Sequence, residues 1–392
     1  MTFDYYKTKT YKDLSGGSNK DLLMVRHGKP KNETHWEQFD DSIFNKDDVV
    51  LLIDGDWLAF STSSNEMERF VEFDHDNVTH KFFGCFTEMR KFCERVGIEY
   101  EPSKGVKKQY NHPKALEFAK SSCKKKIRNA IQATGATKVV IFCGSTGNHR
   151  DSLPLPKLDD NHFFNYKGQR EPEWIPETLK PLKKWLMENW MSHWAVGEEA
   201  DDCITITKKS LDTRGIKCFI HGVDKDFNGE KIGGLYIIGH QEEPRYFEDT
   251  SENRLGWIEA AKTEGGAEKL KGHGDMFLVA QILTIDDADN YSAKKALKVL
   301  GTLKTFSNTK CEKYLSQFKS ERDLWQGAVD HFKKYLPESF TYTDCFGNEV
   351  ESNPISLLNL YYKCAKMREH KDHIPDVIED RLKPLGVDFN ET

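Results

Sequence analysis

Three largely apolar runs of strand length constrain the fold of this 392-residue chain more than any other sequence feature. They cover residues 49–53, 138–142 and 217–223. Apolar runs without regular polar positions are typical of strands that are buried on both faces, as in a parallel sheet. Helical patterns lie between the runs, and strands that alternate with helices predict a parallel sheet flanked by helices. The expected fold class is therefore α/β.

The stretches between and after these runs give the expected organisation. Apolar residues at helical spacing predict helices over residues 81–97, 114–133, 180–194 and 200–211, and a fourth strand is expected over 235–238. We expect three parts: an N-terminal extension over 1–48, an α/β core over 49–275, and a mostly helical region over 276–392 with a turn-rich stretch near 341–353.

The composition narrows the class of protein. The 24 Phe, 14 Tyr and 8 Trp argue against wholesale disorder. No apolar run approaches the roughly 18 residues that a membrane span needs, and the first residues show no apolar segment of a signal peptide. The nine cysteines contain no CxxC pair, so a zinc ribbon is not expected and the thiols fit a reducing, cytoplasmic location. The net charge is −6, but basic and acidic clusters are separated along the chain.

Carboxylates follow the ends of the predicted strands or occur in pairs at helical spacing. Asp54 follows the first run, Asp224 and Asp226 follow the third, and two further pairs are Glu199 with Asp202 and Asp286 with Asp289. Each motif alone is typical of a turn or of a helix cap. In open α/β sheets, however, ligands bind at the carboxyl edge of the strands, where these groups would meet.

Carboxylates that meet at one edge cannot all stay ionised unless a cation lies between them. Oxygen-only ligands favour Mg²⁺ or Mn²⁺, and two such ions are a common device for phosphodiester hydrolysis. The loop at 165–170 adds Lys167 and Arg170, which could hold a phosphate, and Tyr166, which could stack on a base. The alternative reading of this loop is a polar connection with an aromatic anchor.

Five motifs in this order resemble the 5′-nuclease (flap endonuclease) superfamily. They are Leu52–Ala59, Tyr166–Arg170, Gly197–Asp202, Val223–Phe227 and Asp286–Asn290, and the resemblance covers roughly residues 49–300. Within the superfamily, the Asp-Gly-Asp-Trp-Leu and Asp-Lys-Asp-Phe stretches most resemble the 5′→3′ exonucleases of short-tailed phages. The resemblance implies a PIN-like parallel sheet, a helical arch, and a helix-hairpin that grips duplex DNA, shortened here and placed in the helical region.

The resemblance also implies a function and its residues. The function is two-metal 5′→3′ hydrolysis at 5′ ends of duplex DNA, of RNA primers in RNA–DNA hybrids or at 5′ flaps, in phage replication or recombination alongside replication proteins. Two Mg²⁺ ions, replaceable by Mn²⁺, would be held by Asp54, Glu199, Asp201, Asp202, Asp224, Asp226, Asp286 and Asp289. Catalytic roles would fall to Lys167, Arg170, Asp224 and Asp226, and substrate contacts to Tyr166, Arg150, Ser292, Lys294, Lys295 and Lys298.

Two departures from the family pattern leave alternatives open. Gly144 or Cys143 stands where the family carries an Asp after its second strand, with Asp56 as a substitute, and the Gly-rich hairpin after Asn290 is abbreviated. One alternative is therefore a catalytically weakened protein that binds DNA ends or branched DNA, and another is a PIN-type ribonuclease. The Arg-His-Gly stretch that contains His27 resembles the start of histidine phosphatases, but no second His fits that family.

Overall fold

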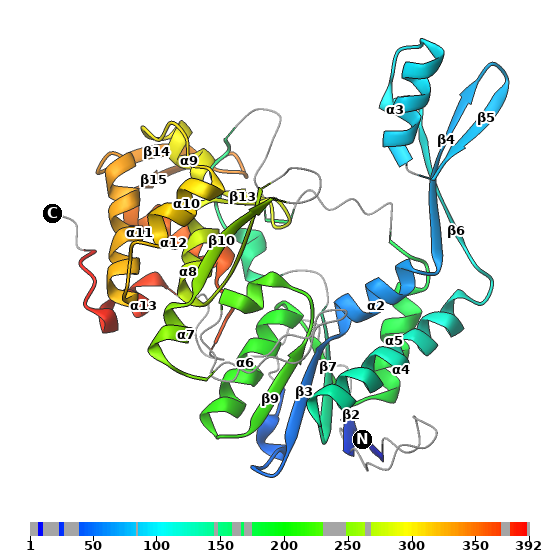
Figure 1. Ribbon diagram of the computed structural model, residues 1–392, viewed down its shortest axis with the longest axis horizontal. Coiled ribbons are helices and arrows are strands. Elements are labelled where there is room, and N and C mark those ends of the chain that lie inside the picture. The colour runs from blue at the N-terminus through cyan, green and yellow to red at the C-terminus, as the bar shows by residue number, and fades with distance from the viewer. Residues whose placement is uncertain are drawn as a thin grey trace.

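The computed structural model describes residues 7–10, 23–26, 39–83, 85–144, 148–158, 166–167, 175–229, 248–262, 268–369 and 377–389. Within this part of the chain, an α/β body lies beside a mostly helical region, and a smaller lobe projects away from both (Figure 1). No helix of the described segments is both long and apolar enough to cross a bilayer.

The central sheet of the α/β body has the strand order β1-β2-β7-β3-β9, with β8 also paired to β7. The strands are β1 (Lys7–Thr10), β2 (Leu23–Arg26), β3 (Val49–Asp54), β7 (Lys138–Gly144), β8 (Ser192–Ala195) and β9 (Lys217–His221). All pairs are parallel except the antiparallel β1–β2 pair. The three apolar runs therefore form the adjacent strands β7, β3 and β9, as the sequence predicts.

Helices cover both faces of this sheet (Figure 1). The helices α2 (Gly55–Ser64), α4 (Ala115–Thr134) and α5 (Leu179–Asn189) pack together on one face, and α6 (Ala200–Thr213) packs on the other. The β3–α2 junction is tight, because a Cβ on Gly55 would lie 2.6 Å from both the Cys143 Sγ and the Phe142 carbonyl oxygen. Glycine is therefore required where the first strand turns into its helix.

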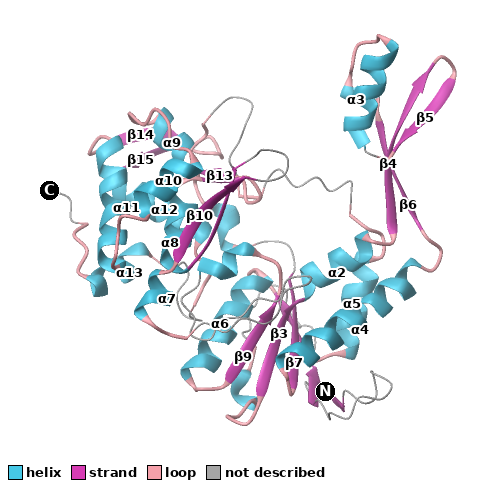
Figure 2. Cartoon of the chain, viewed as in Figure 1, coloured by secondary structure: helices cyan, strands magenta, loops and turns pink. Residues whose placement is uncertain are grey.

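The projecting lobe consists of strands β4 (Met67–His75), β5 (Val78–Phe82) and β6 (Val106–Asn111) and the helix α3 (Cys85–Val96). The strands form an antiparallel sheet in the order β5-β4-β6, which is drawn in magenta in Figure 2. The short 3₁₀ turn η2 (Pro102–Lys104) leads into β6. A small core of its own, built on Val71, Phe73, Met89, Phe92 and Cys93, joins α3 to one face of this sheet.

The C-terminal region surrounds the wholly buried helix α8 (Gly274–Leu283). Its other helices are α7 (Ser251–Leu255), α9 (Ala293–Val299), α10 (Asn308–Leu315), α11 (Glu321–Tyr335), α12 (Pro354–Ala365) and α13 (Ile378–Leu385). Short antiparallel pairs complete it: β10 (Trp257–Lys262) with β11 (Glu268–His273), β12 (Ile285–Asp286) with β13 (Tyr291–Ser292), and β14 (Phe340–Thr343) with β15 (Glu349–Ser352). The mostly helical character matches the prediction, and the turn-rich stretch is the β14–β15 hairpin.

Two helix predictions need correction. The helix expected over 180–194 ends at Asn189, and residues 192–195 form β8 because their backbone pairs with β7. The helix expected over 81–97 begins at Cys85, after β5. The lobe strands were not predicted, and β1 and β2 add strands from the expected N-terminal extension. The strand expected over 235–238, His27 and most of residues 1–48 lie outside the described residues. The helical arch stays a prediction, because much of the chain between β7 and α5 lies there too.

Candidate metal centre

The first carboxylate of the site ends β3. Asp54 is 6% exposed, and its side chain accepts a hydrogen bond from the Trp57 backbone N–H at 2.9 Å, which caps α2. Burial, with the nearby charges of Asp56 and Asp224, raises the pKa of Asp54 to about 7. Burial and neighbouring negative charge both disfavour the ionised carboxylate, so a cation beside Asp54 would stabilise it.

Three carboxylates with different neighbours lie at the N-terminus of α6. Glu199 precedes the helix, and Asp201 and Asp202 lie in its first turn. Burial and then the charges of Asp54, Asp224 and Glu199 raise the pKa of Asp201 well above its usual value, so Asp201 interacts electrostatically with the strand-end carboxylates. Helical geometry separates the neighbouring side chains by about 100°, and Asp202 points elsewhere.

Asp202 belongs to a buried ion pair. The Arg150 guanidinium donates to both its carboxylate oxygens at 2.6 and 2.9 Å and to Glu199 at 2.8 Å. Burial alone would raise the pKa of Asp202, but Arg150 outweighs it and holds that pKa well below its usual range. Arg150 itself is 2% exposed and also donates to the backbone carbonyls of Lys363 and Lys366. The Arg150 guanidinium is thus enclosed by α6 and the segment that ends α12, and its substrate contact stays a prediction.

A second carboxylate group forms where β9 meets the C-terminal region. Ligand oxygens of Asp226, Asp286 and Asp289 lie within 4.8 Å of one another, a spacing that could hold a metal ion. Asp226 follows Asp224 in the 3₁₀ turn η5 (Lys225–Gly229), and its N–H donates to the Asp224 carboxylate at 2.9 Å. Burial raises the pKa of Asp226 to about 7 and that of Asp289 to about 6.

Two lysines offset part of this negative charge. The Lys225 ammonium contacts Asp286 and lies 3.6 Å from Asp226. The Lys167 ammonium contacts Glu199 and lies 3.9 Å from Asp289, so it bridges the two carboxylate groups. Lys225 was not predicted as a site residue, although its place between two of the predicted aspartates is the sequence signal for it.

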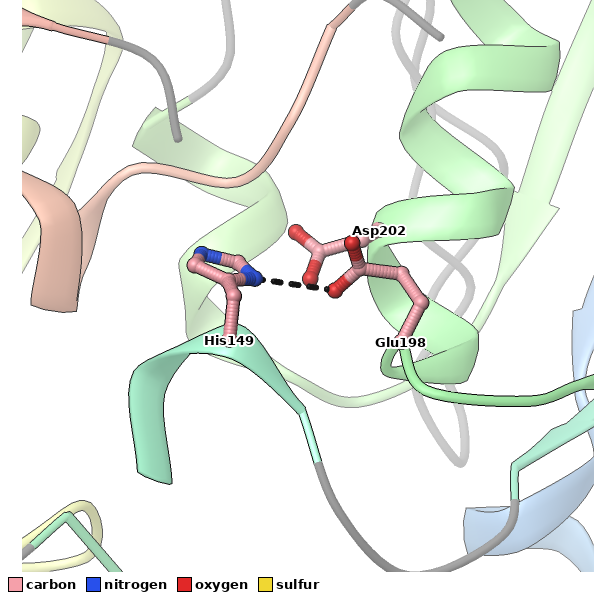
Figure 3. A group of neighbouring side chains, drawn as sticks. All are labelled: His149, Glu198 and Asp202. Carbon is pink, nitrogen blue, oxygen red and sulfur yellow. Dashed lines mark hydrogen bonds and ion pairs between the residues drawn. The ribbon is translucent and has the colours of Figure 1, made fainter. Parts of the chain in front are cut away.

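A third cluster differs in chemistry. His149 from η3 (His149–Ser152) donates to or accepts from Glu198 at 3.1 Å, beside Asp202 on α6 (Figure 3). Three such groups could hold an ion, but Arg150 and Arg368 already neutralise both carboxylates. The cluster therefore fits a buried ion-pair network better than a metal site. No sequence pattern indicated Arg368, which lies far along the chain.

The predicted substrate residues are buried, cap a helix or are exposed on its surface. Tyr166 is buried, and its hydroxyl donates to Glu199 and Asp289 at 3.3 Å each, so its ring is not an open stacking surface here. Ser292 caps α9 by accepting from the Lys295 N–H at 3.3 Å. On that helix Lys295 and Lys298 are exposed and Lys294 is half-buried. Arg170 lies outside the described residues.

Asp56 lies near Asp54 and pairs with a lysine. It accepts from the Gly144 N–H at 3.0 Å and lies 2.7 Å from the Lys183 ammonium. A Cβ on Gly144 would lie 3.2 Å from the same carboxylate, so the Asp56–Lys183 pair fills the space beside position 144. Its role as a substitute ligand stays a prediction.

The donor set fits hard divalent cations. Asp201 is close enough to Asp54 and Asp224 to feel their charges, while Asp226, Asp286 and Asp289 form the second group, and all supply carboxylate oxygen. Mg²⁺ and Mn²⁺ prefer such ligands. Several of these carboxyl groups are buried with raised pKa values, which is the condition that a bound cation relieves.

Comparison with known proteins adds structural likeness only. No protein-family model and no curated protein matches the chain. The chain is similar to the solved structure of the T5 D15 protein co-crystallised with metal ions, with 13% identity over 81% of this chain and 85% of that chain and a TM-score of 0.38. It is also similar to a complex of the bacteriophage T5 D15 flap endonuclease with DNA and metal ions, with 12% identity, coverage of 72% and 78%, and a TM-score of 0.37.

A third likeness is to the T5 5′-exonuclease with bound zinc, with 12% identity over 86% of this chain and 97% of that chain and a TM-score of 0.36. The identities and TM-scores are low, so these likenesses carry no conclusion about the activity of this chain.

Proposed function

We propose that this chain is a metal-dependent 5′-nuclease that hydrolyses phosphodiester bonds. The observation that carries the proposal is the convergence of carboxylates from separate segments at the carboxyl edge of one parallel sheet. Asp54, Asp201 and Asp224 interact electrostatically, and Asp226, Asp286 and Asp289 lie beside them with ligand oxygens within 4.8 Å of one another. A buried concentration of like charge is costly, so a functional need for cations best explains it.

We propose separate metal-binding, positioning and phosphate-binding roles for the residues of the site. Asp54, Glu199, Asp201, Asp224, Asp226, Asp286 and Asp289 would hold two Mg²⁺ ions, which supply an activated water and stabilisation of the leaving oxygen when bound. Asp202 was expected as a direct ligand, and we propose instead that it and Arg150 position Glu199 and the start of α6. Lys167, with Arg170, would contact the scissile phosphate and stabilise its developing charge. The exposed Lys295 and Lys298 would contact backbone phosphates of duplex DNA.

The resemblance of the sequence motifs to the 5′-nuclease superfamily supports a more specific activity. We propose 5′→3′ exonuclease action at 5′ ends of duplex DNA, with RNA–DNA hybrids and 5′ flaps as related substrates, in phage replication or recombination with Mg²⁺ as the resident ion. A second candidate is a DNA-binding protein that does not cleave. It is favoured by one observation, the Asp56–Lys183 pair that occupies the space beside Gly144.

A cleavage assay separates these functions. Duplex, 5′-flap, single-stranded DNA, RNA–DNA hybrid and RNA, each labelled at the 5′ or the 3′ end, are incubated with Mg²⁺, Mn²⁺ or EDTA. Metal-dependent release from the 5′ end supports the nuclease, and tight binding without cleavage supports the second candidate. The double variant Asp224→Asn with Asp226→Asn should lose cleavage and keep its DNA affinity, because it removes two metal ligands and two negative charges. Cleavage by that variant would refute the metal assignment.

A further inference from the structure

One face of the lobe sheet is covered by α3, and the opposite face is open. Strand β6 alternates between exposed residues on the open face (Val106, Lys108 and Tyr110) and half-buried residues on the other. Tyr110 is 54% exposed, and Phe83, which follows β5, is 60% exposed. Exposed aromatic side chains mark an interaction surface when they gather on one face, whereas single ones are common.

The aromatic and basic side chains of this face lie together. Phe70 on β4 is directly opposite Lys108 on β6, and its ring centroid lies 5.6 Å from that of Phe83. The Lys81 ammonium lies 4.9 Å from the Phe70 ring centroid. We name this surface the open face and define it by Phe70, Lys81, Phe83, Val106, Lys108 and Tyr110.

The open face also carries acidic groups. Glu72 lies 3.7 Å from the Lys81 ammonium, so these two charges offset each other. Asp74 accepts from the Thr79 hydroxyl at 2.6 Å near the end of the sheet, and Glu68 is directly opposite Tyr110. The face therefore has little net charge, and a ligand would be held by its flat apolar groups more than by its phosphates.

We propose that the open face binds single-stranded nucleic acid by stacking bases on Phe70, Phe83 and Tyr110, with Lys81 and Lys108 beside the phosphates. Aromatic rings on a sheet with interleaved cations suit this ligand, because every base has a stacking face and the backbone is anionic. This inference rests on the proposed function, and it assigns the unpaired strand of that substrate to the lobe.

The test is a binding titration that needs no cleavage. A fluorescent oligo(dT) and a matching oligo(U) are titrated with the full chain in EDTA, and anisotropy gives the Kd. The double variant Phe83→Ser with Tyr110→Ser should weaken binding at least about 10-fold, because each lost stack is worth about 1–3 kcal/mol. The matched control is Phe346→Ser, which alters an equally exposed phenylalanine in the β14–β15 hairpin and should change the Kd less than about 2-fold.

Salt dependence gives an independent reading. The variant Lys108→Gln should reduce the slope of log K against log salt by about 0.7, because single strands contribute about 0.7 per neutralised phosphate. Lys81→Gln should change the slope less, because Glu72 already offsets the charge of Lys81. Cleavage of a blunt duplex should be unchanged in all these variants, since none of the altered residues belongs to the carboxylate site.

Two results would overturn the inference. One is an oligonucleotide Kd that is unchanged in the aromatic double variant or too weak to measure in the unaltered chain. The other is a concentration-dependent dimer, seen by light scattering, that the aromatic double variant abolishes, which would make the open face a contact between two copies. Absence of cleavage on every substrate would refute the proposed function, while the titration in EDTA would still decide the role of the open face.

Discussion

The buried pair of Arg368 and Glu198 gives the sharpest quantitative prediction. Both side chains are at most 2% exposed, and the Arg368 guanidinium contacts the Glu198 carboxylate directly. The backbone N–H of Arg368 also donates to the Asp202 carboxylate at 2.9 Å, and the backbone carbonyl of Arg368 accepts from the Thr205 hydroxyl at 2.8 Å. The segment after α12 is thereby tied to the start of α6. The perturbation is Arg368→Met, alone and together with Glu198→Gln.

The magnitude follows from burial. Removing one member of a buried pair leaves an uncompensated charge and costs about 3–5 kcal/mol of unfolding free energy, whereas replacing both members costs much less. Burial already raises the pKa of Glu198, so its carboxylate depends on the cations beside it. We therefore expect the double change to cost less than the sum of the single changes, with a coupling free energy on the order of 2 kcal/mol or more.

Urea unfolding, followed by tryptophan fluorescence, measures the four unfolding free energies of this cycle. The control cycle changes Lys120 and Glu117 on α4, a pair at 2.9 Å in which Glu117 is 70% exposed. Its coupling should stay within about 0.5 kcal/mol, because water screens exposed pairs. Additive effects of Arg368→Met and Glu198→Gln would refute the argument that burial makes this pair interdependent.

Three further predictions concern the site, the pH dependence of stability and the core. Lys167→Ala should slow single-turnover cleavage on the order of 10²-fold, because its ammonium lies at the carboxylates where the phosphate would bind. Burial lowers the pKa of His331 from 6.5 to about 4, so unfolding free energy should fall by about 3 kcal/mol as pH drops from about 6.5 to about 4, since the unfolded state takes up the proton first. His331→Phe should remove this part of the pH dependence, measured by urea unfolding at pH 7 and pH 4.5. Gly55→Ala should destabilise the chain by about 1–3 kcal/mol, because its Cβ would overlap the Phe142 carbonyl, and thermal unfolding would measure it.

Each of these predictions has a result that contradicts it. An unchanged single-turnover rate in Lys167→Ala would remove the lysine from the chemistry. An equal loss of stability at pH 4.5 with and without His331 would place the proton uptake elsewhere, and His273, whose pKa burial also lowers to about 4, would be tested next. A melting temperature of Gly55→Ala equal to that of the unaltered chain would mean that the β3–α2 junction can relax. The control for Gly55→Ala is Phe346→Ser, a surface change that should leave the melting temperature unchanged. Gly135→Ala would not serve as this control, because φ is +69° at Gly135 and a side chain there is strained.

Local sequence patterns predicted the central strands β3, β7 and β9, because the burial of an apolar run depends little on which segments pack beside it. The runs that became β3, β7 and β9 are apolar at almost every position and too short for a typical helix, so a strand buried between two layers is the expected structure. Hydrogen bonding between distant segments decided the exceptions. The amphipathic pattern of 180–194 fits a helix, but residues 192–195 form β8 because they pair with residues 141–144 of β7, beyond the pairing of β2 at Lys138.

The sequence by itself determined the α/β class, the order of the motifs and the carboxylates that end each strand. Only the tertiary structure decided which charged group lies beside each carboxylate. Asp201 and Asp202 are neighbours in sequence, yet Asp201 interacts with the charge of Asp54 while Asp202 accepts hydrogen bonds from Arg150. The same holds for Arg368 and the lobe sheet, which no local pattern indicated. The physical reason is that periodicity shows whether a side chain is buried, whereas charge pairing depends on which distant segment is packed against it.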